Sequence, residues 1–231
     1  MASAEPGRRV LYGRRQGPKL RPGSRRLLEV QLPELEVAVA PGLDPRALFV
    51  PAPAAVWLEI GFGGGEHLAA LAARHPGTGF LGVEPFINGV AKLLRAVETQ
   101  RLGNVRVLRD DARLLLKALP DASIERAFVL FPDPWPKLRH HKRRIVNAET
   151  VADLARVIRP GGELRLATDD PGYARWMLAV LLAEPHFAWL AERADDWRQR
   201  PDDWPGTRYE AKALAAGRRP AYLRFRREAP G

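Results

Sequence analysis

From about residue 55 onward, short apolar runs alternate with longer amphipathic segments, and this alternation constrains the possible fold more than any other feature of the chain. The pattern is typical of a parallel β-sheet whose strands are connected by crossover helices. The expected strands are Ala55–Ile60, Gly79–Glu84, Val105–Arg109, Glu125–Phe131, Glu163–Thr168, His186–Glu192 and Ala221–Arg227. The expected helices are Glu66–His75, Ile87–Arg101, Ala112–Leu119, Ile145–Ile158, Tyr173–Ala183 and Tyr209–Ala216.

The last two expected strands have little chain between them, so we expect an antiparallel pair that closes the sheet. The sequence therefore predicts an α/β fold with a doubly wound, seven-stranded, mostly parallel sheet of the Rossmann-like kind. Ligands of such folds bind at the carboxyl ends of the strands. Residues 28–231 show no internal repeat and no linker, which indicates a single domain, and Pro160-Gly161-Gly162 is expected to break the chain between a helix and a strand.

The charge of the chain indicates an anionic partner, and nucleic acid is the favoured one. The formal net charge is +10 and the sequence pI is about 10.6. The cations gather in residues 1–27, 137–144 and 208–227. The first of these regions is rich in glycine and is expected to be a flexible basic arm, although a passive solvated tail is the alternative.

Other classes of protein are excluded by composition. The chain has no cysteine, which removes disulfides, thiolate catalysis and cysteine metal sites, and its five histidines lack the spacing of a zinc site, so no metal is expected. No run approaches the roughly 20 apolar residues that cross a bilayer. The arginine-rich N-terminus has no apolar core of a signal peptide, so we expect a cytoplasmic protein without a membrane partner.

A glycine-rich turn follows the first expected strand in the segment LEIGFGGGE, where Glu59 precedes Gly61 and Gly63. Glycines let a backbone turn tightly and approach a ligand closely. The dinucleotide fingerprint would need a third glycine where Glu66 stands, and that carboxylate would repel a diphosphate. A cationic ligand such as S-adenosylmethionine would not be repelled, and the acid followed by G-x-G-x-G resembles the first motif of class I methyltransferases. A purely structural glycine turn is the alternative.

Two further acids lie at successive strand ends. Glu84 ends the second expected strand, where a carboxylate can accept both ribose hydroxyls, and Asp111 follows the third, where it can reach an adenine amino group. Either acid could instead cap a helix, and Asp111 precedes an amphipathic segment directly. Together they predict a nucleoside-containing cofactor, and methyl donation fits them better than hydride transfer.

The fourth expected strand leads into the loop FPDPWPK (131–137), which is followed by LRHHKRR (138–144). Proline restricts φ and lacks a donor, so three prolines in five residues predict a rigid loop. It presents the carboxylate of Asp133 and the indole of Trp135, which could stack on a base or pack the loop. The cations that follow suggest a substrate with phosphates.

These motifs together resemble the bacterial tRNA (guanine-N7-)-methyltransferases over roughly residues 50–227. The matching segments are LEIGFGGGEHL (58–68), GVEPFINGV (82–90), RDDA (109–112), FPDPWPKLRHHKRRIV (131–146), RPGGELRLATDDPGYARWM (159–177) and TRYEAKAL (207–214). Leu138 departs from the family, because a basic residue is common there. Residues 1–27 lie outside the match, and a contact of the arm with RNA is conjecture.

The resemblance implies an S-adenosylmethionine-dependent enzyme that methylates a guanosine of tRNA, in the variable loop. It implies that S-adenosylmethionine or the reacting centre is contacted by Glu59, Gly61, Gly63, Glu84, Asp111 and Asp133. It implies that the target nucleoside is met by Lys137, Asp169, Thr207, Arg208, Tyr209 and Glu210. Contacts with the rest of the RNA are implied for Arg139, His140, His141, Lys142, Arg143 and Arg144.

Guanine N7 carries an in-plane lone pair and no proton, so its methylation needs no obligatory general base. The catalytic role expected for Asp133 is to stabilise the developing cation or to hold the N1–H and amino edge of the guanine. Asp170 could simply cap a helix, and Thr207 with Glu210 has the form of a capping box. Methylation of an exocyclic amino group, a non-catalytic RNA-binding protein and, distantly, a dehydrogenase are the alternatives; monomer and homodimer are both open.

Overall fold

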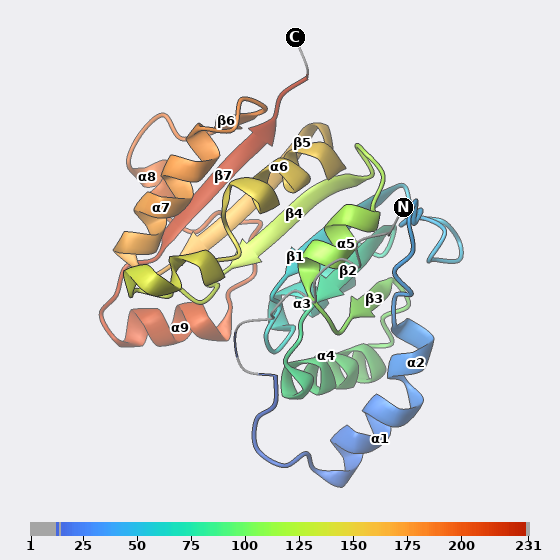
Figure 1. Ribbon diagram of the computed structural model, residues 1–231. Coiled ribbons are helices and arrows are strands. Elements are labelled where there is room, and N and C mark those ends of the chain that lie inside the picture. Colours follow the sequence, from blue (N-terminus) through green and yellow to red (C-terminus); the bar gives the residue numbers. More distant parts are fainter. Residues whose placement is uncertain (1–12, 14, 230–231) are drawn as a thin grey trace, which may run out of the picture.

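In the computed structural model, residue 13 and residues 15–229 are described, and within them a single sheet has the strand order β3-β2-β1-β4-β5-β7-β6 (Figure 1). Its strands are β1 (Ala55–Ile60), β2 (Thr78–Val83), β3 (Val105–Leu108), β4 (Ile124–Leu130), β5 (Ile158–Thr168), β6 (Phe187–Trp189) and β7 (Ala221–Arg227). Strands β1 to β5 pair in parallel, and β7 is antiparallel to both β5 and β6. The predicted doubly wound, seven-stranded fold with a closing antiparallel pair is thus confirmed.

The helices connect the strands as crossovers or extend the sheet's layers. Their bounds are α1 (Pro22–Val30), α2 (Leu32–Leu35), α3 (Glu66–Arg74), α4 (Ile87–Gln100), α5 (Ala112–Ala118), α6 (Ala148–Val157), α7 (Pro171–Leu182), α8 (Asp195–Arg198) and α9 (Arg208–Ala215), with a 3₁₀ helix η1 (Leu138–Arg143). No helix of the described residues is both long and apolar enough to cross a membrane.

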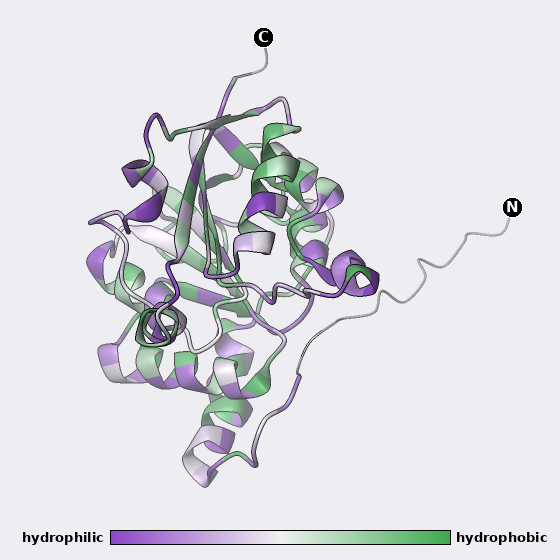
Figure 2. Ribbon diagram, turned by 90° about the vertical axis from the view of Figure 1, so that its left-hand side faces the viewer, coloured by the Kyte–Doolittle hydropathy of each residue, from purple (hydrophilic) through white to green (hydrophobic). Residues whose placement is uncertain are grey.

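The sheet is buried on both faces, which explains the continuous apolar runs of its central strands. Leu58 of β1 and Leu164 of β5 lie in one core cluster with α5, α6 and α7, while Trp57 and Phe128 lie in the other with α1, α3 and α4. Figure 2 shows apolar residues gathered in and beside the sheet, with helices on both sides of it. This layering leaves the carboxyl ends of the parallel strands open to the surface.

Most element boundaries shift by one or two residues from those expected, and three differ by more: β6 ends at Trp189 rather than at residue 192, and α6 and β5 begin elsewhere. Helix α6 begins at Ala148 rather than at residue 145, because the Asn147 side chain accepts the Thr150 N–H (3.1 Å) and caps the helix there. Strand β5 begins at Ile158 and runs through the Pro-Gly-Gly segment that was expected to interrupt the chain. A register shift beside Ile124 and the left-handed conformation of Gly161 (φ +78°) accommodate the segment within the strand.

The basic arm expected over residues 1–27 is shorter than its predicted range. Residues 22–27 belong to α1, whose Leu27 is 2 % exposed and lies in the core cluster shared with α4. Residues 1–12 and 14 lie outside the described residues.

Candidate active site

The carboxyl ends of β1 to β4 open into one cavity of about 710 Å³, a volume typical of small-molecule sites, which span roughly 300–1,000 Å³. Of the residues predicted to contact cofactor or substrate, the cavity is lined by Gly61, Gly63, Glu84, Asp111, Asp133, Arg143, Arg144, Arg208 and Tyr209. Sequence positions from 61 to 209 therefore meet at one edge of the sheet, as expected for this topology.

The glycine turn between β1 and α3 uses conformations that L-residues with a side chain rarely adopt. Gly61, Gly63 and Gly65 have φ values of +74°, +56° and +76°. A Cβ on Gly63 would come within 3.1 Å of the Tyr209 ring. A Cβ on Gly89 in α4 would lie 2.1 Å from the Gly63 carbonyl oxygen, so α4 packs directly against the turn. The turn thus presents bare backbone to the cavity.

Glu84, just after β2, braces this turn. Its carboxylate accepts the N–H of Gly63 (2.7 Å) and that of Phe86 (2.9 Å), and the side chain is buried. Burial raises the pKa of Glu84 above 4.5, the two backbone hydrogen bonds lower it, and the negative charges of Asp133 and Glu59 raise it further. A cation or hydroxyl donors in the cavity would favour the ionised carboxylate.

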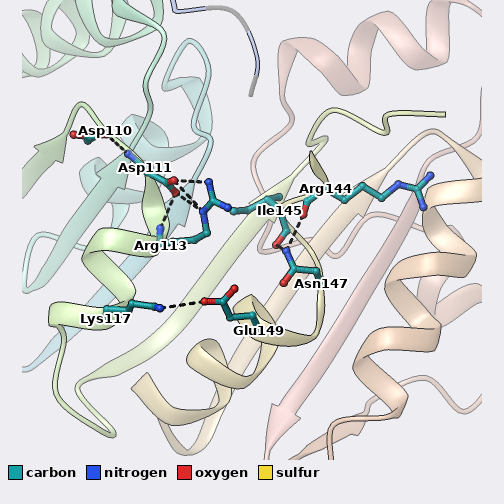
Figure 3. Close-up of polar contacts among 8 residues, drawn as sticks. All are labelled: Asp110, Asp111, Arg113, Lys117, Arg144, Ile145, Asn147 and Glu149. Atoms are coloured by element: carbon teal, nitrogen blue, oxygen red, sulfur yellow. Dashed lines mark hydrogen bonds and ion pairs between the residues drawn. The ribbon is translucent and has the colours of Figure 1, made fainter. Parts of the chain in front are cut away.

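Asp111 begins α5, and the capping role weighed for it is confirmed. One of its oxygens accepts the backbone N–H of Arg113 (3.0 Å), and the Arg113 guanidinium binds both oxygens at 2.5–2.9 Å (Figure 3). Asp110, which was not among the predicted site residues, accepts the Asp111 N–H (2.7 Å) and also lines the cavity. Its position directly before Asp111, just after β3, is the sequence feature from which Asp110 could have been predicted as a site residue.

Glu59 lies behind the cavity wall. It is 4 % exposed and pairs with His67 of α3 (Oε2 to Nδ1, 2.7 Å), whose ring packs edge-on against Phe128 (4.9 Å). It is absent from the residues that line the cavity in the described part of the chain. A direct cofactor contact through Glu59 is therefore not what this geometry favours.

The loop after β4 carries Asp133 on the cavity wall, with its side chain exposed. Phe131 and Trp135 flank it with φ values of +50° and +44°, conformations that cost about 1–3 kcal/mol each in non-glycine residues. Neighbours hold the loop: Phe131 N–H donates to Ala167 O (2.7 Å), and the Arg143 guanidinium lies 4.9 Å from the Trp135 ring centre. Trp135 therefore packs the loop and borders the cavity as well.

The basic cluster beyond this loop is partly exposed and partly built into the fold. Lys137, Arg139 and Lys142 are exposed. Partial desolvation, followed by the positive charges of Arg143 and Arg139, lowers the pKa of His140 below 6.5 and so disfavours its charged form. His141 packs edge-on against Trp176 of α7 (5.3 Å).

Arg144, predicted from the resemblance to meet RNA, is 5 % exposed. This burial does not favour the RNA contact that the resemblance implies for Arg144.

The residues expected at the target nucleoside separate into two groups. Arg208 and Tyr209, at the start of α9, line the cavity. Thr207 and Glu210 form the capping box that begins α9, as the alternative interpretation required. Glu210 is buried and also accepts the Tyr222 hydroxyl (2.5 Å), while Arg200 pairs with it at 2.9 Å.

Asp169 and its neighbour at the end of β5 are both engaged in the structure. Asp169 pairs with Arg218 (2.6 Å) and lies outside the cavity wall. Asp170 caps α7 by accepting the Tyr173 N–H (2.7 Å), as the capping alternative for it predicted.

Two cavity residues on α4 were missed. Asn88 and Lys92 line the cavity, and their spacing of four residues directly after Glu84 places them on one helix face. Asn88 also accepts the Gly17 N–H (2.7 Å) and donates to Pro18 O (2.8 Å), which brings the N-terminal segment to the cavity rim. No group of histidine, aspartate and glutamate suited to a metal ion occurs among the residues that the structure describes.

Solved structures with the same fold include RNA methyltransferases. The 16S rRNA methyltransferase KamB aligns with a TM-score of 0.57 at 17% identity, covering 80% of this chain and 91% of that one. A 16S rRNA (adenine(1408)-N(1))-methyltransferase from Catenulisporales acidiphilia, solved as a point mutant, aligns with a TM-score of 0.54 at 18% identity, covering 82% and 95%. The strand order and these alignments give the chain the fold of the class I methyltransferases.

The family model described as "Putative methyltransferase" matches residues 53–222. Proteins named tRNA (guanine-N(7)-)-methyltransferase are 52% identical in Rhodospirillum rubrum, over 94% of this chain and 87% of the relative, and 51% identical in Paramagnetospirillum magneticum, over 99% and 96%. The chain belongs to the tRNA (guanine-N(7)-)-methyltransferase family.

Proposed function

We propose that this protein transfers a methyl group from S-adenosylmethionine to N7 of a guanosine in tRNA, in the variable loop. The observation that carries the proposal is the position of Asp133 on the wall of the cavity at the strand ends, with the exposed cations Lys137, Arg139 and Lys142 directly after its loop. The names of the 47–52% identical relatives support the choice of tRNA and of guanine N7.

The residues of the cavity fit S-adenosylmethionine. Its volume of about 710 Å³ suits a nucleoside with an amino-acid tail, and the carboxylates of Glu84 and Asp133 suit a cationic ligand. Glu84 would accept the ribose hydroxyls, Asp110 or Asp111 would meet the adenine, and the bare glycine turn allows close backbone approach. When bound, the cofactor would supply a methyl group on a positively charged sulfur. A nucleophile that attacks the methyl carbon displaces this sulfur as a neutral thioether. Glu66 in the first turn of α3 disfavours a diphosphate at that place.

In this reaction the protein has to orient the guanine toward the methyl group and stabilise the positive charge that develops on the base. Guanine N7 has no proton to lose, and its methylation creates a cation, so a carboxylate close to the base lowers the energy of the transition state. Asp133 can provide this charge, or it can accept the N1–H and amino hydrogens of the guanine and so orient N7. Correct alignment of two reactants can contribute about 7–11 kcal/mol, which makes a rigid loop useful here.

Binding of tRNA is assigned to the exposed cations around the cavity. Lysine and arginine side chains that neutralise phosphates release counterions and give steeply salt-dependent affinity. Arg208 and Tyr209 also line the cavity, and the Tyr209 ring lies beside Gly63, which supports the assignment of these two side chains to the target nucleoside.

The direct test is transfer of labelled methyl groups from S-adenosylmethionine to bulk unmodified tRNA, followed by nucleoside mass spectrometry. We expect the label in N7-methylguanosine, and borohydride with aniline should cleave the product RNA at that nucleoside. Label in an N-methylated exocyclic amino group would overturn the assignment of the substrate site while leaving the fold and cofactor in place. Sequencing of the cleavage point tests the variable-loop position.

A further inference from the structure

Arg144 differs from the other cations that follow the Asp133 loop. It is 5 % exposed, whereas Lys137, Arg139 and Lys142 are exposed side chains. In Figure 3 its side chain extends away from Asp111 and Arg113. Arg144 also borders the cavity, but a side chain this buried has little surface left to offer an RNA phosphate.

Two aromatic rings of α7 hold the guanidinium. Its central carbon lies 4.9 Å from the ring centre of Tyr173 and 4.8 Å from that of Trp176, which are cation–π distances. The rings are fixed in turn at Val146, whose carbonyl accepts the Trp176 Nε1–H (2.7 Å) and whose N–H donates to the Tyr173 hydroxyl (3.4 Å). Arg144 thus connects to a rigid part of the molecule.

The other end of this connection is the loop that carries Asp133. Arg144 Nε donates to the carbonyl of Pro134 at 2.8 Å, one residue after Asp133. The prolines stiffen the backbone of the loop, but they have no N–H groups that could hydrogen-bond it to neighbouring elements. The positive φ values of Phe131 and Trp135 also require support from outside the loop.

We propose that Arg144 is a positioning residue that fixes Pro134, and through it Asp133, against the cavity, rather than a contact to RNA. The inference rests on the proposed methyl transfer. In the proposed arrangement, α7 is the rigid support, and Arg144 connects it to the loop that carries Asp133.

Replacement of Arg144 by lysine distinguishes a positioning role from a contact to RNA. It keeps the positive charge, so a phosphate contact would largely survive, but it lacks both the planar group that stacks between two rings and the Nε donor. Lys142→Ala is the matched control, because it removes an exposed cation of the same cluster and with it the phosphate contact proposed for that residue.

The experiment compares wild type, Arg144→Lys and Lys142→Ala in kcat at saturating tRNA, in S-adenosylmethionine affinity by calorimetry and in tRNA affinity across salt concentrations. For Arg144→Lys we expect kcat to fall by about 10²-fold, because misplacement by about 1 Å costs that much. Its tRNA affinity and salt slope should match wild type. For Lys142→Ala the slope of log K against log salt should fall by about 0.7–0.9.

Wild-type kcat in Arg144→Lys would overturn the proposal. Arg144→Ala is measured as well, and a salt slope lowered in it as in Lys142→Ala would assign Arg144 to a phosphate instead. Trp176→Leu provides an independent variant that removes one supporting ring without changing any charge. We expect it to reproduce the loss of kcat with unchanged tRNA affinity, and a retained kcat would contradict the proposed link. An inactive wild-type protein would instead refute the methyl-transfer function itself.

Discussion

At the scale of single residues, the acids at the strand ends have distinct tasks. Glu84 is buried and fixes the glycine turn through two backbone hydrogen bonds. Asp111 is neutralised by Arg113, and Glu59 is paired with His67 behind the wall. Asp110 and Asp133 are both exposed on the cavity wall, and Asp133 is the one whose loop leads into the basic cluster. These environments support the proposal that Asp133 provides the electrostatic stabilisation at the reacting base.

Replacing Asp133 by asparagine should remove this charge while preserving the shape of the side chain. We expect kcat to fall by about 10²–10³-fold, the usual cost of losing one group that stabilises transition-state charge. Binding of S-adenosylmethionine and tRNA should change little, because other residues provide most contacts. Steady-state kinetics and calorimetry measure both effects. Asp202→Asn, an exposed acid outside the cavity, is the control, and an unchanged kcat in Asp133→Asn would exclude a central role.

Affinity for S-adenosylmethionine should decrease as the pH falls through the raised pKa of Glu84. Burial places this pKa above 4.5, and only the ionised carboxylate can accept hydroxyl donors with both oxygens while attracting a cation. Binding should therefore lower the pKa and release protons in that pH range. Calorimetry in buffers of different ionisation enthalpy detects the release. An affinity that is flat across this range, or one whose pH dependence survives in Glu84→Gln, would show that another group titrates.

At the scale of elements, helix caps decide which residues reach the cavity. Asp111, Asn147, Asp170 and Thr207 each begin a helix by accepting a backbone N–H. The cap at Thr207 starts α9 so that the next two residues line the cavity wall. The buried carboxylate of Glu210 pairs with Arg200 and accepts the Tyr222 hydroxyl, and these contacts anchor the same end of the helix.

Thr207→Ala should lower the free energy of unfolding by about 1 kcal/mol, the typical cost of a lost N-cap. Thr207→Ser keeps the hydroxyl that accepts the Glu210 N–H and should restore most of the stability. Urea unfolding followed by circular dichroism measures the difference. Wild-type stability in Thr207→Ala combined with a large loss of kcat would show instead that the hydroxyl acts on the substrate directly.

At the scale of the whole molecule, one edge of the sheet combines a cavity that holds both acids and cations with exposed cations around it. The net charge of +10 attracts RNA, while Glu84 and Asp133 keep the cavity itself suitable for a cationic cofactor. The N-terminal segment joins this edge, because Ile87 N–H donates to Arg15 O (3.0 Å) and Gly17 N–H to Asn88. We propose that this segment adds cations to the RNA surface.

Removing residues 2–20 should weaken tRNA binding and flatten its salt dependence without unfolding the protein, because α1 remains. The deletion removes Arg8, Arg9, Arg14, Arg15 and Lys19. The slope should fall by about 0.7–0.9 for each phosphate that is no longer neutralised, and filter binding across salt concentrations measures it. Leu27→Ala is the contrasting variant: it should cost about 3 kcal/mol of stability and leave the slope unchanged. An identical slope in the deletion would show that the segment is passive.

The sequence by itself determined the seven strands, their alternation with helices, the strand-end acids and the helix caps. These features depend on residues within a few positions of one another, such as the glycine turn after Glu59 or the Thr207–Glu210 box. Only the tertiary structure decided that Arg144 is buried, that Glu59 pairs with His67 and that β5 runs through its Pro-Gly-Gly segment. The aromatic rings around Arg144 lie about 30 residues later in the chain, in α7, and nothing in a run of cations reveals such a neighbour. Periodicity and capping are local, whereas burial and pairing of a charge depend on which distant elements the fold brings against it.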